Sequence, residues 1–181
     1  CFYIRLKGVS ILTDPFLSSR ASPLRFSGPR RLVSTPLSIN DLAPDVIIIS
    51  HNHYDHLDTE TLKSIANKEN ITLITTLKTG RLLRKLGFQR IVEMDWYHEL
   101  EEGNTRYQCL PAYHFSGRNL VDEDRTLWGS FAIEQDGVKI FFAGDTGYGT
   151  EFSRIGQLTG PYDIALVPIG AYAPRAVFGA V

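Results

Sequence analysis

Three of the five histidines in this sequence fall within six residues, as His51, His53 and His56. His51 and His53 are two residues apart, so in extended backbone both imidazole rings project to the same side. Asp55 and His56 follow where the chain leaves the strand, which lets them turn towards a neighbouring position. Imidazole and carboxylate groups are suitable donors for Zn²⁺ and related divalent ions. The cluster therefore predicts a site that can hold two metal ions a few ångströms apart.

The residues before this cluster predict the element that carries it. Residues 45–50 read Asp-Val-Ile-Ile-Ile-Ser, a short continuous apolar run between polar ends. Such a run is typical of a strand that is buried on both faces. The histidine cluster follows at once, at the C-terminal end of the strand, where layered α/β folds favour ligands and active sites. The sequence therefore places the expected metal site at the edge of a sheet.

The rest of the chain alternates strands with helices at first and then becomes rich in hairpins. Further strands are expected over residues 2–6, 9–13, 71–75, 107–112, 129–135, 138–143 and 163–168, the last of them buried. Lys7-Gly8 and Asp136-Gly137 predict tight hairpin turns. Helices are expected over residues 59–68, 79–86 and 149–158. These elements favour a mixed α/β fold of two packed sheets with helices on the outer faces.

Composition narrows the class of protein. The 181 residues suit one domain, and 43% of them are hydrophobic, as in an ordinary globular protein. With 19 basic and 20 acidic residues the net charge is −1, so no nucleic acid partner is expected. No apolar run approaches the roughly 20 residues that span a bilayer. The two separated cysteines form no disulfide framework, which favours a reducing, cytoplasmic compartment.

Several motifs resemble one known family. The residues from Ser50 to Asp58 resemble the HxHxDH signature of the metallo-β-lactamase superfamily. Two later motifs resemble that superfamily in the same order, namely Pro-Ala-Tyr-His-Phe-Ser-Gly around His114 and Phe-Ala-Gly-Asp-Thr-Gly around Asp145. The chain is also similar to the subgroup that contains N-acyl-phosphatidylethanolamine phospholipase D. This similarity is carried by residues 13–15, 20–23, 28–31, 127–131, 142–148 and 168–172.

The resemblance implies a fold and a set of metal ligands. The fold would be a four-layer αββα sandwich, formed by a single domain over residues 1–181 that is incomplete at one or both termini. The implied ligands are His51, His53 and His114 for one metal ion, Asp55 and His56 for the second, and Asp145 as the bridge between the two. Zinc is the expected metal, with manganese or iron as alternatives. The superfamily supplies a further histidine to the second metal, whereas this sequence has none after His114.

The activity implied by the resemblance is metal-dependent hydrolysis. Two cations would lower the pKa of a shared water, and the resulting hydroxide would attack a phosphorus or carbonyl centre. Asp145 would fix the distance between the metals, and Asp55 would also orient the nucleophile. The expected substrate is a phosphodiester of an N-acylated phospholipid. A lactonase acting on a small phosphorylated lactone is the first alternative. A metal-binding but inactive domain is the second, because of the absent histidine.

A segment over residues 16–40 combines positive charge with apolar side chains and has no acidic residue. Its arginines are Arg20, Arg25, Arg30 and Arg31. Because a guanidinium group pairs well with phosphate, Arg20 and Arg25 are candidates for substrate binding, together with Tyr148 near Asp145. The apolar side chains would meet acyl chains or make a peripheral contact with a membrane. A solvated loop held by structural arginine contacts is the competing interpretation.

Overall fold

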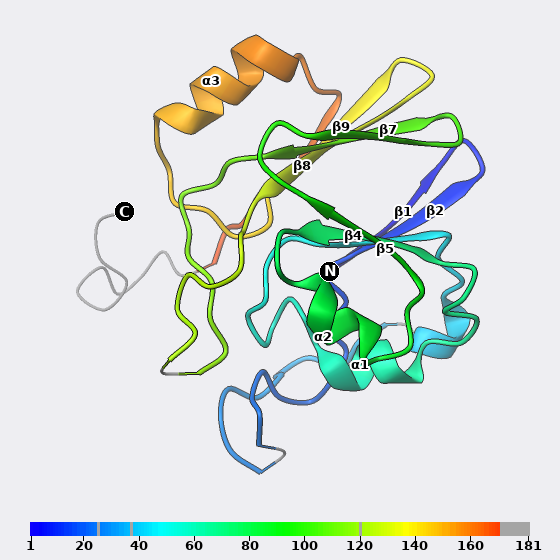
Figure 1. Ribbon diagram of the computed structural model, residues 1–181, viewed down its shortest axis with the longest axis vertical. Coiled ribbons are helices and arrows are strands. Elements are labelled where there is room, and N and C mark those ends of the chain that lie inside the picture. The colour runs from blue at the N-terminus through cyan, green and yellow to red at the C-terminus, as the bar shows by residue number, and fades with distance from the viewer. Residues whose placement is uncertain (25, 37, 120, 171–181) are drawn as a thin grey trace. The chain divides into compact units, whose positions relative to one another are not determined.

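The computed structural model describes residues 1–24, 26–36, 38–119 and 121–170 (Figure 1). The chain divides into two compact units. The first unit consists of Cys1–Met94 and Ser116–Leu127. The second consists of Asp95–Phe115 and the described residues from Trp128 onward. Each unit contains one five-stranded sheet and a hydrophobic cluster of its own.

The sheet of the first unit has the strand order β1-β2-β3-β4-β5. Its strands are β1 (Phe2–Leu6), β2 (Val9–Thr13), β3 (Val46–Ile49), β4 (Thr72–Thr76) and β5 (Arg90–Met94). β1 and β2 are antiparallel, and the other neighbours are parallel. Lys7 and Gly8 have φ angles of 46° and 93°, as a tight two-residue hairpin requires. The hairpin predicted at these two residues is confirmed.

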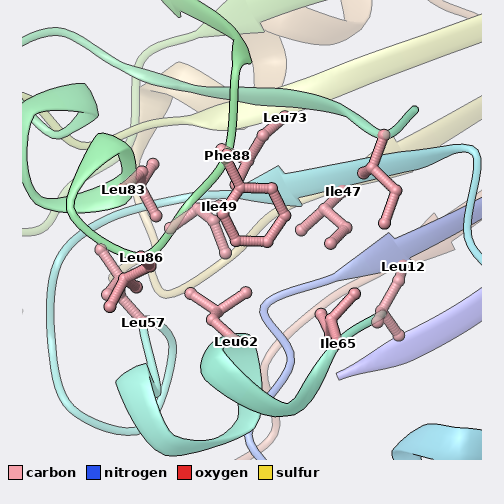
Figure 2. Close-up of a cluster of buried hydrophobic side chains, with 11 residues drawn as sticks. Leu12, Ile47, Ile49, Leu57, Leu62, Ile65, Leu73, Leu83, Leu86 and Phe88 are labelled. Carbon is pink, nitrogen blue, oxygen red and sulfur yellow. The ribbon is translucent and has the colours of Figure 1, made fainter. Parts of the chain in front are cut away.

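Two short α-helices pack on the sheet of the first unit. They are α1 (Thr59–Ser64) and α2 (Gly80–Arg84), and a 3₁₀ turn, η1 (Ile39–Asp41), precedes β3. Figure 2 shows Leu62 of α1 and Leu83 of α2 beside Ile47, Ile49 and Leu73 of the sheet. All four residues of β3 are buried, as the continuous apolar run predicted. The predicted helix over residues 59–68 is shorter than expected, because Ile65 already has extended backbone.

The sheet of the second unit has the order β10-β9-β8-β7-β6. Its elements are β6 (Glu99–Glu102), β7 (Thr105–Leu110), β8 (Ser130–Gln135), β9 (Val138–Phe142), α3 (Thr150–Thr159) and β10 (Ile164–Leu166). β9 and β10 are parallel, and the other pairs are antiparallel. Asp136 and Gly137 form the predicted turn, with φ angles of 50° and 80°. Ile155 of α3 is buried with Phe141 of β9.

One prediction about the second unit is wrong in part. Residues 163–168 do contain a strand, but Ile164 and Val167 are exposed rather than buried. The reason is that β10 lies at the edge of its sheet and pairs only with β9 among the described strands. Two further strands, β5 and β6, were not anticipated. None of the described helices combines the length and the apolar character that a membrane crossing demands.

Candidate metal centre

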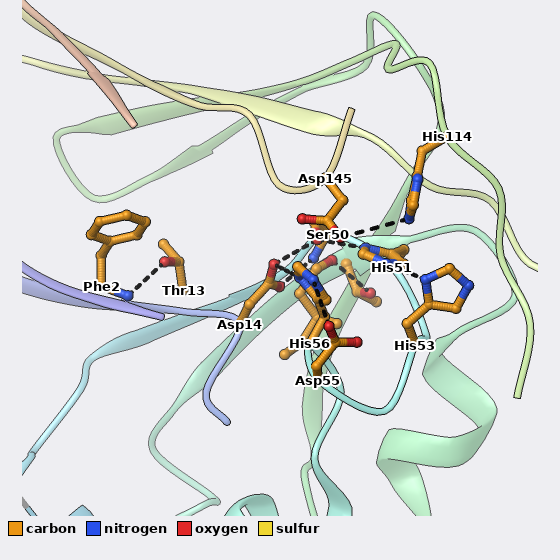
Figure 3. Close-up of polar contacts among 12 residues, drawn as sticks. Phe2, Thr13, Asp14, Ser50, His51, His53, Asp55, His56, His114 and Asp145 are labelled. Carbon is orange, nitrogen blue, oxygen red and sulfur yellow. Dashed lines mark hydrogen bonds and ion pairs between the residues drawn. The ribbon is translucent and has the colours of Figure 1, made fainter. Parts of the chain in front are cut away.

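The first group of predicted ligands follows β3 in the first unit. His51 Nε2 and His53 Nδ1 lie 2.8 Å apart, and the rings of His51 and His56 have centroids 4.2 Å apart. Asp55 Oδ2 lies 3.8 Å from His56 Nε2, and about half of the Asp55 side chain (52%) is exposed. The structure therefore gathers the four side chains of the predicted motif around the end of one buried strand (Figure 3).

Asp14 also lies against these histidines, although no role was predicted for it from the sequence. It follows β2, which runs parallel to β3 with Thr13 opposite Ile48, so both strands end at the same edge of the sheet. The Asp14 carboxylate is 2% exposed and accepts hydrogen bonds from the Ser50 amide at 2.7 Å and the Ser50 hydroxyl at 2.6 Å. Its Oδ2 also lies 2.6 Å from His56 Nδ1 (Figure 3).

These contacts engage one ring nitrogen of each of two histidines. An ionised carboxylate only accepts hydrogen bonds, so His56 Nδ1 would donate to Asp14, and His56 Nε2 lies 3.8 Å from Asp55 Oδ2. Ser50 has one hydroxyl hydrogen, which it donates to Asp14. The 2.9 Å contact between Ser50 Oγ and His51 Nδ1 is then donated by the imidazole, and His51 Nε2 lies 2.8 Å from His53 Nδ1. Metal-binding histidines are held in this way by a hydrogen bond from the other ring nitrogen.

The second group of predicted ligands lies in the second unit. His114 follows β7, Asp145 follows β9, and His114 Nε2 is 4.0 Å from Asp145 Oδ2. Two hydrogen bonds connect the loops that carry them. The Tyr113 amide donates to Thr146 Oγ1 at 3.0 Å, and the Gly147 amide donates to the Tyr113 carbonyl at 2.7 Å. The two loops therefore hold each other in place.

The donor atoms within each unit suit a metal ion. Two ligands on one tetrahedral zinc, each about 2.0–2.1 Å from it, lie roughly 3.3 Å apart. The 2.8 Å between the nitrogens of His51 and His53 and the 4.0 Å between His114 and Asp145 fall on either side of that value. Small side-chain rotations would bring either pair to it. Neutral imidazoles and a carboxylate also match the donor preferences of zinc, manganese and iron.

The candidates for substrate binding have different surroundings. The Arg20 guanidinium donates to the carbonyl of Gly28 at 2.7 Å within its own loop, and Arg25 lies outside the described residues. Tyr148 is 87% exposed, and its ring stacks on Phe152.

An open hollow of about 370 Å³ in the first unit was not anticipated. It is lined by Phe16, Ala21, Pro29, Arg30, Arg31, Leu32, Val33 and Asp55.

Cys109 takes no part in this chemistry. It is fully buried in β7, and burial raises the pKa of its thiol well above the ordinary value. A thiol that stays protonated is neither a nucleophile nor a metal ligand at neutral pH.

Comparison with known proteins identifies relatives of this chain. A model of the beta-lactamase superfamily domain matches residues 10–179. An uncharacterized protein of Mycobacterium tuberculosis is 41% identical over 172 residues, which cover 93% of this chain and 46% of that protein. The N-acyl-phosphatidylethanolamine-hydrolyzing phospholipase D 1 of Caenorhabditis elegans is 36% identical over 184 residues, covering 95% of this chain and 52% of the enzyme. The chain thus spans about half the length of these relatives.

A solved structure has a similar fold. A possible metal-dependent hydrolase from Veillonella parvula superposes with a TM-score of 0.69 at 21% identity. The match covers 88% of this chain and 64% of that protein. Together with the domain match, the two mixed five-stranded sheets confirm the predicted fold class.

Proposed function

The chain belongs to the metallo-β-lactamase superfamily, and on this premise we propose that it is a metal-dependent hydrolase that cleaves the phosphodiester of an N-acyl-phosphatidylethanolamine-type phospholipid. The observation that carries the proposal is the cluster in which Asp14 and Ser50 contact one ring nitrogen each of His56 and His51, while the other ring nitrogens lie 3.8 Å from Asp55 Oδ2 and 2.8 Å from His53 Nδ1. The finer choice of substrate is supported by the 36% identity to the C. elegans phospholipase.

We assign the ligands as the family pattern suggests. His51, His53 and His114 would hold one divalent ion, Asp55 and His56 the second, and Asp145 both. The identity of the metal is part of the proposal, with zinc preferred because three imidazoles suit it. When bound, such ions lower the pKa of water towards neutrality and stabilise negative charge on phosphoryl oxygens. The half-exposed carboxylate of Asp55 would accept a hydrogen bond from the attacking water and orient it.

The hollow beside Asp55 supports an amphipathic, anionic substrate. The exposed guanidinium side chain of Arg30 and the apolar side chains of Leu32 and Val33 line the same hollow as the Asp55 carboxylate. Arg30 would bind a phosphoryl oxygen, because guanidinium and phosphate pair through two parallel hydrogen bonds. Apolar atoms next to the charge would contact an acyl chain. We therefore assign to Arg30 the phosphate-binding role that was predicted from the sequence for Arg20 and Arg25.

The outer part of the same loop is suited to a lipid surface. Leu32 is 94% exposed and Phe26 is 81% exposed, and Leu24 and Val33 are exposed as well. No acidic residue lies between residues 16 and 40, so nothing within the segment repels an anionic membrane. Exposed apolar side chains interleaved with arginine are typical of peripheral membrane contact. We propose that this loop brings the site to its substrate in the bilayer.

The proposal is tested with the full-length protein, loaded with zinc, on vesicles that contain N-acyl-phosphatidylethanolamine. We expect release of phosphatidate and N-acylethanolamine, loss of activity with a chelator, and recovery when zinc is added back. Turnover of a phosphorylated lactone in place of the lipid would assign the chain to the lactonases. A protein that binds zinc but hydrolyses neither substrate would be a metal-binding domain without activity.

A variant of Arg30 tests the role of the loop in the same assay. Arg30→Ala should raise KM for the vesicle substrate about 10-fold, since a charge-assisted hydrogen bond contributes roughly 1.5–3 kcal/mol. Arg5→Ala is the matched control, because Arg5 is an exposed arginine of β1 outside the loop. A short soluble phosphodiester should show a smaller effect. Equal KM values for Arg30→Ala and Arg5→Ala would exclude Arg30 from substrate binding.

A further inference from the structure

Arg118 lies four residues after His114, in a segment that the structure assigns to the first unit. Two hydrogen bonds fasten the C-terminal end of this segment, Ser116–Leu127, to the chain at the end of β4. The Leu127 amide donates to the Leu77 carbonyl at 2.9 Å, and Thr76 Oγ1 donates to the Leu127 carbonyl at 2.6 Å. Ser116 Oγ closes the segment on itself by donating to the Thr126 carbonyl at 2.6 Å. Arg118 therefore projects from an anchored segment.

The Arg118 side chain forms hydrogen bonds with the loop that carries three of the proposed ligands. Its Nη1 donates to the carbonyl of Asn52 at 2.7 Å and to the carbonyl of Leu57 at 2.8 Å. These two carbonyls flank the stretch of chain that contains His53, Asp55 and His56. One guanidinium thus connects the beginning of the loop to its end.

Two more contacts join this segment to the loop. The Arg118 guanidinium carbon lies 3.9 Å from the centroid of the Tyr54 ring, so the cation stacks on an aromatic side chain within the loop. The neighbouring Gly117 amide donates to Asn52 Oδ1 at 2.7 Å. The segment therefore holds the loop through a side chain, a backbone amide and a stacked ring.

Burial makes these hydrogen bonds costly to lose. Asn52 and Leu57 are both buried, and a buried carbonyl without a donor costs about 1–3 kcal/mol. Arg118 is itself partly buried, and this burial lowers the pKa of its guanidinium, although arginine stays protonated in proteins. Within the loop, the His56 and Leu57 amides both donate to the His53 carbonyl. These bonds form one turn, and Arg118 holds the carbonyls at its two ends.

We infer that Arg118 is a positioning residue of the metal centre: it holds the loop from Asn52 to Leu57 so that His53, Asp55 and His56 present their donor atoms in a geometry that binds metal. This inference rests on the metal binding proposed above. Arg118 itself contacts backbone carbonyls and an aromatic ring, and its role is to set the affinity and the coordination geometry of the ions.

The test compares Arg118→Ala with wild type in the full-length protein. The readouts are zinc affinity, by competition with a chromophoric chelator, and the visible absorption spectrum after loading with Co²⁺. Outer contacts of metal ligands typically contribute a factor of roughly 10–100 to metal affinity. We expect Arg118→Ala to weaken zinc binding by about that factor and to alter the Co²⁺ spectrum. It should lower kcat and leave KM nearly unchanged.

Two further variants complete the design. Arg118→Lys should recover part of the affinity, because an ammonium group can donate to the same carbonyls but lacks the planar stacking surface. Arg125→Ala is the control, since Arg125 is an exposed arginine of the same segment. It should match wild type in every readout. If Arg118→Ala fails to fold, Arg118→Lys and Asn52→Ala carry the test.

The outcomes separate this inference from the proposed function. A wild-type protein that binds no divalent ion would overturn the proposed function itself. Normal zinc affinity and an unchanged Co²⁺ spectrum in Arg118→Ala, with a melting temperature below that of wild type, would reduce Arg118 to a structural residue. A raised KM with normal zinc affinity would make it a substrate-binding residue instead. Either of the last two results would overturn the positioning role.

Discussion

Asp14 orients the imidazole rings of both His51 and His56. It does so directly for His56, through a 2.6 Å contact, and through the Ser50 hydroxyl for His51. The carboxylate is buried and has three donor contacts, from the Ser50 amide, the Ser50 hydroxyl and His56 Nδ1. A single side chain therefore orients one ligand proposed for each of the two ions.

The substitution Asp14→Asn should disturb both histidines. The asparagine side chain has one oxygen acceptor where aspartate has two, and its NH₂ group is a donor. This NH₂ group would face His56 Nδ1 or Ser50 Oγ, and the remaining donors would compete for the single oxygen. His56 would shift its proton to Nε2 and lose the lone pair that a metal requires. We expect zinc affinity and kcat to fall by roughly 10–100-fold.

The measurement is zinc competition and hydrolysis with the full-length Asp14→Asn variant. His98→Ala serves as the control, because His98 is exposed and its Nδ1 accepts only a 3.4 Å contact from the Asp95 amide. Zinc affinity in Asp14→Asn equal to that in His98→Ala would show that the network does not set the tautomers.

At the scale of elements, the loops that follow β7 and β9 depend on a close approach at Gly149. A Cβ added there would lie 2.2 Å from Cε2 of Tyr113. Tyr113 also donates its amide to Thr146 Oγ1 and precedes His114, so displacement of its ring reaches a proposed ligand. The φ angle of Gly149 is −173°, which any residue can adopt, so the demand is for space. Glycine is required here because the loops touch.

Gly149→Ala should therefore lower stability and metal affinity together. We expect a loss of about 1–3 kcal/mol in the free energy of unfolding, the usual cost of overpacking. Gly156→Ala in α3 is the matched control, because no atom lies within 4 Å of its added Cβ and alanine favours the helix by roughly 1 kcal/mol. Urea unfolding of both variants measures the difference. A Gly149→Ala protein as stable as Gly156→Ala would mean that Tyr113 moves aside freely.

The elements also explain how far the sequence could predict the structure. β3 and its histidines were predictable because a continuous apolar run and a period-two pattern are local signals. β5 and β6 were missed because Arg90–Met94 and Glu99–Glu102 mix charged and apolar residues.

The roles of Asp14 and Arg118 were missed for another reason. Their partners lie 36–42 and 61–66 residues away along the chain, so only the folded sheet brings them together. Two hints pointed to Asp14: it directly follows a predicted strand, and it lies within residues 13–15, which carry part of the family similarity.

At the scale of the whole molecule, the proposed ligands are shared between the two units. The first unit carries His51, His53, Asp55 and His56, and the second carries His114 and Asp145. Each unit builds its own sheet and orders its own ligands through local hydrogen bonds. Metal binding is expected to stabilise the folded protein by mass action.

The metal content of the full-length protein tests this account most directly. The protein is saturated with zinc, freed of excess metal by gel filtration and examined by elemental analysis, beside Asp145→Asn and His98→Ala. We expect close to two zinc ions per chain in wild type and in His98→Ala. Asp145→Asn should hold fewer, because the proposed bridge serves both ions. A wild-type protein that keeps no zinc would contradict the metal centre, and one that keeps a single ion, unchanged in Asp145→Asn, would contradict the binuclear site.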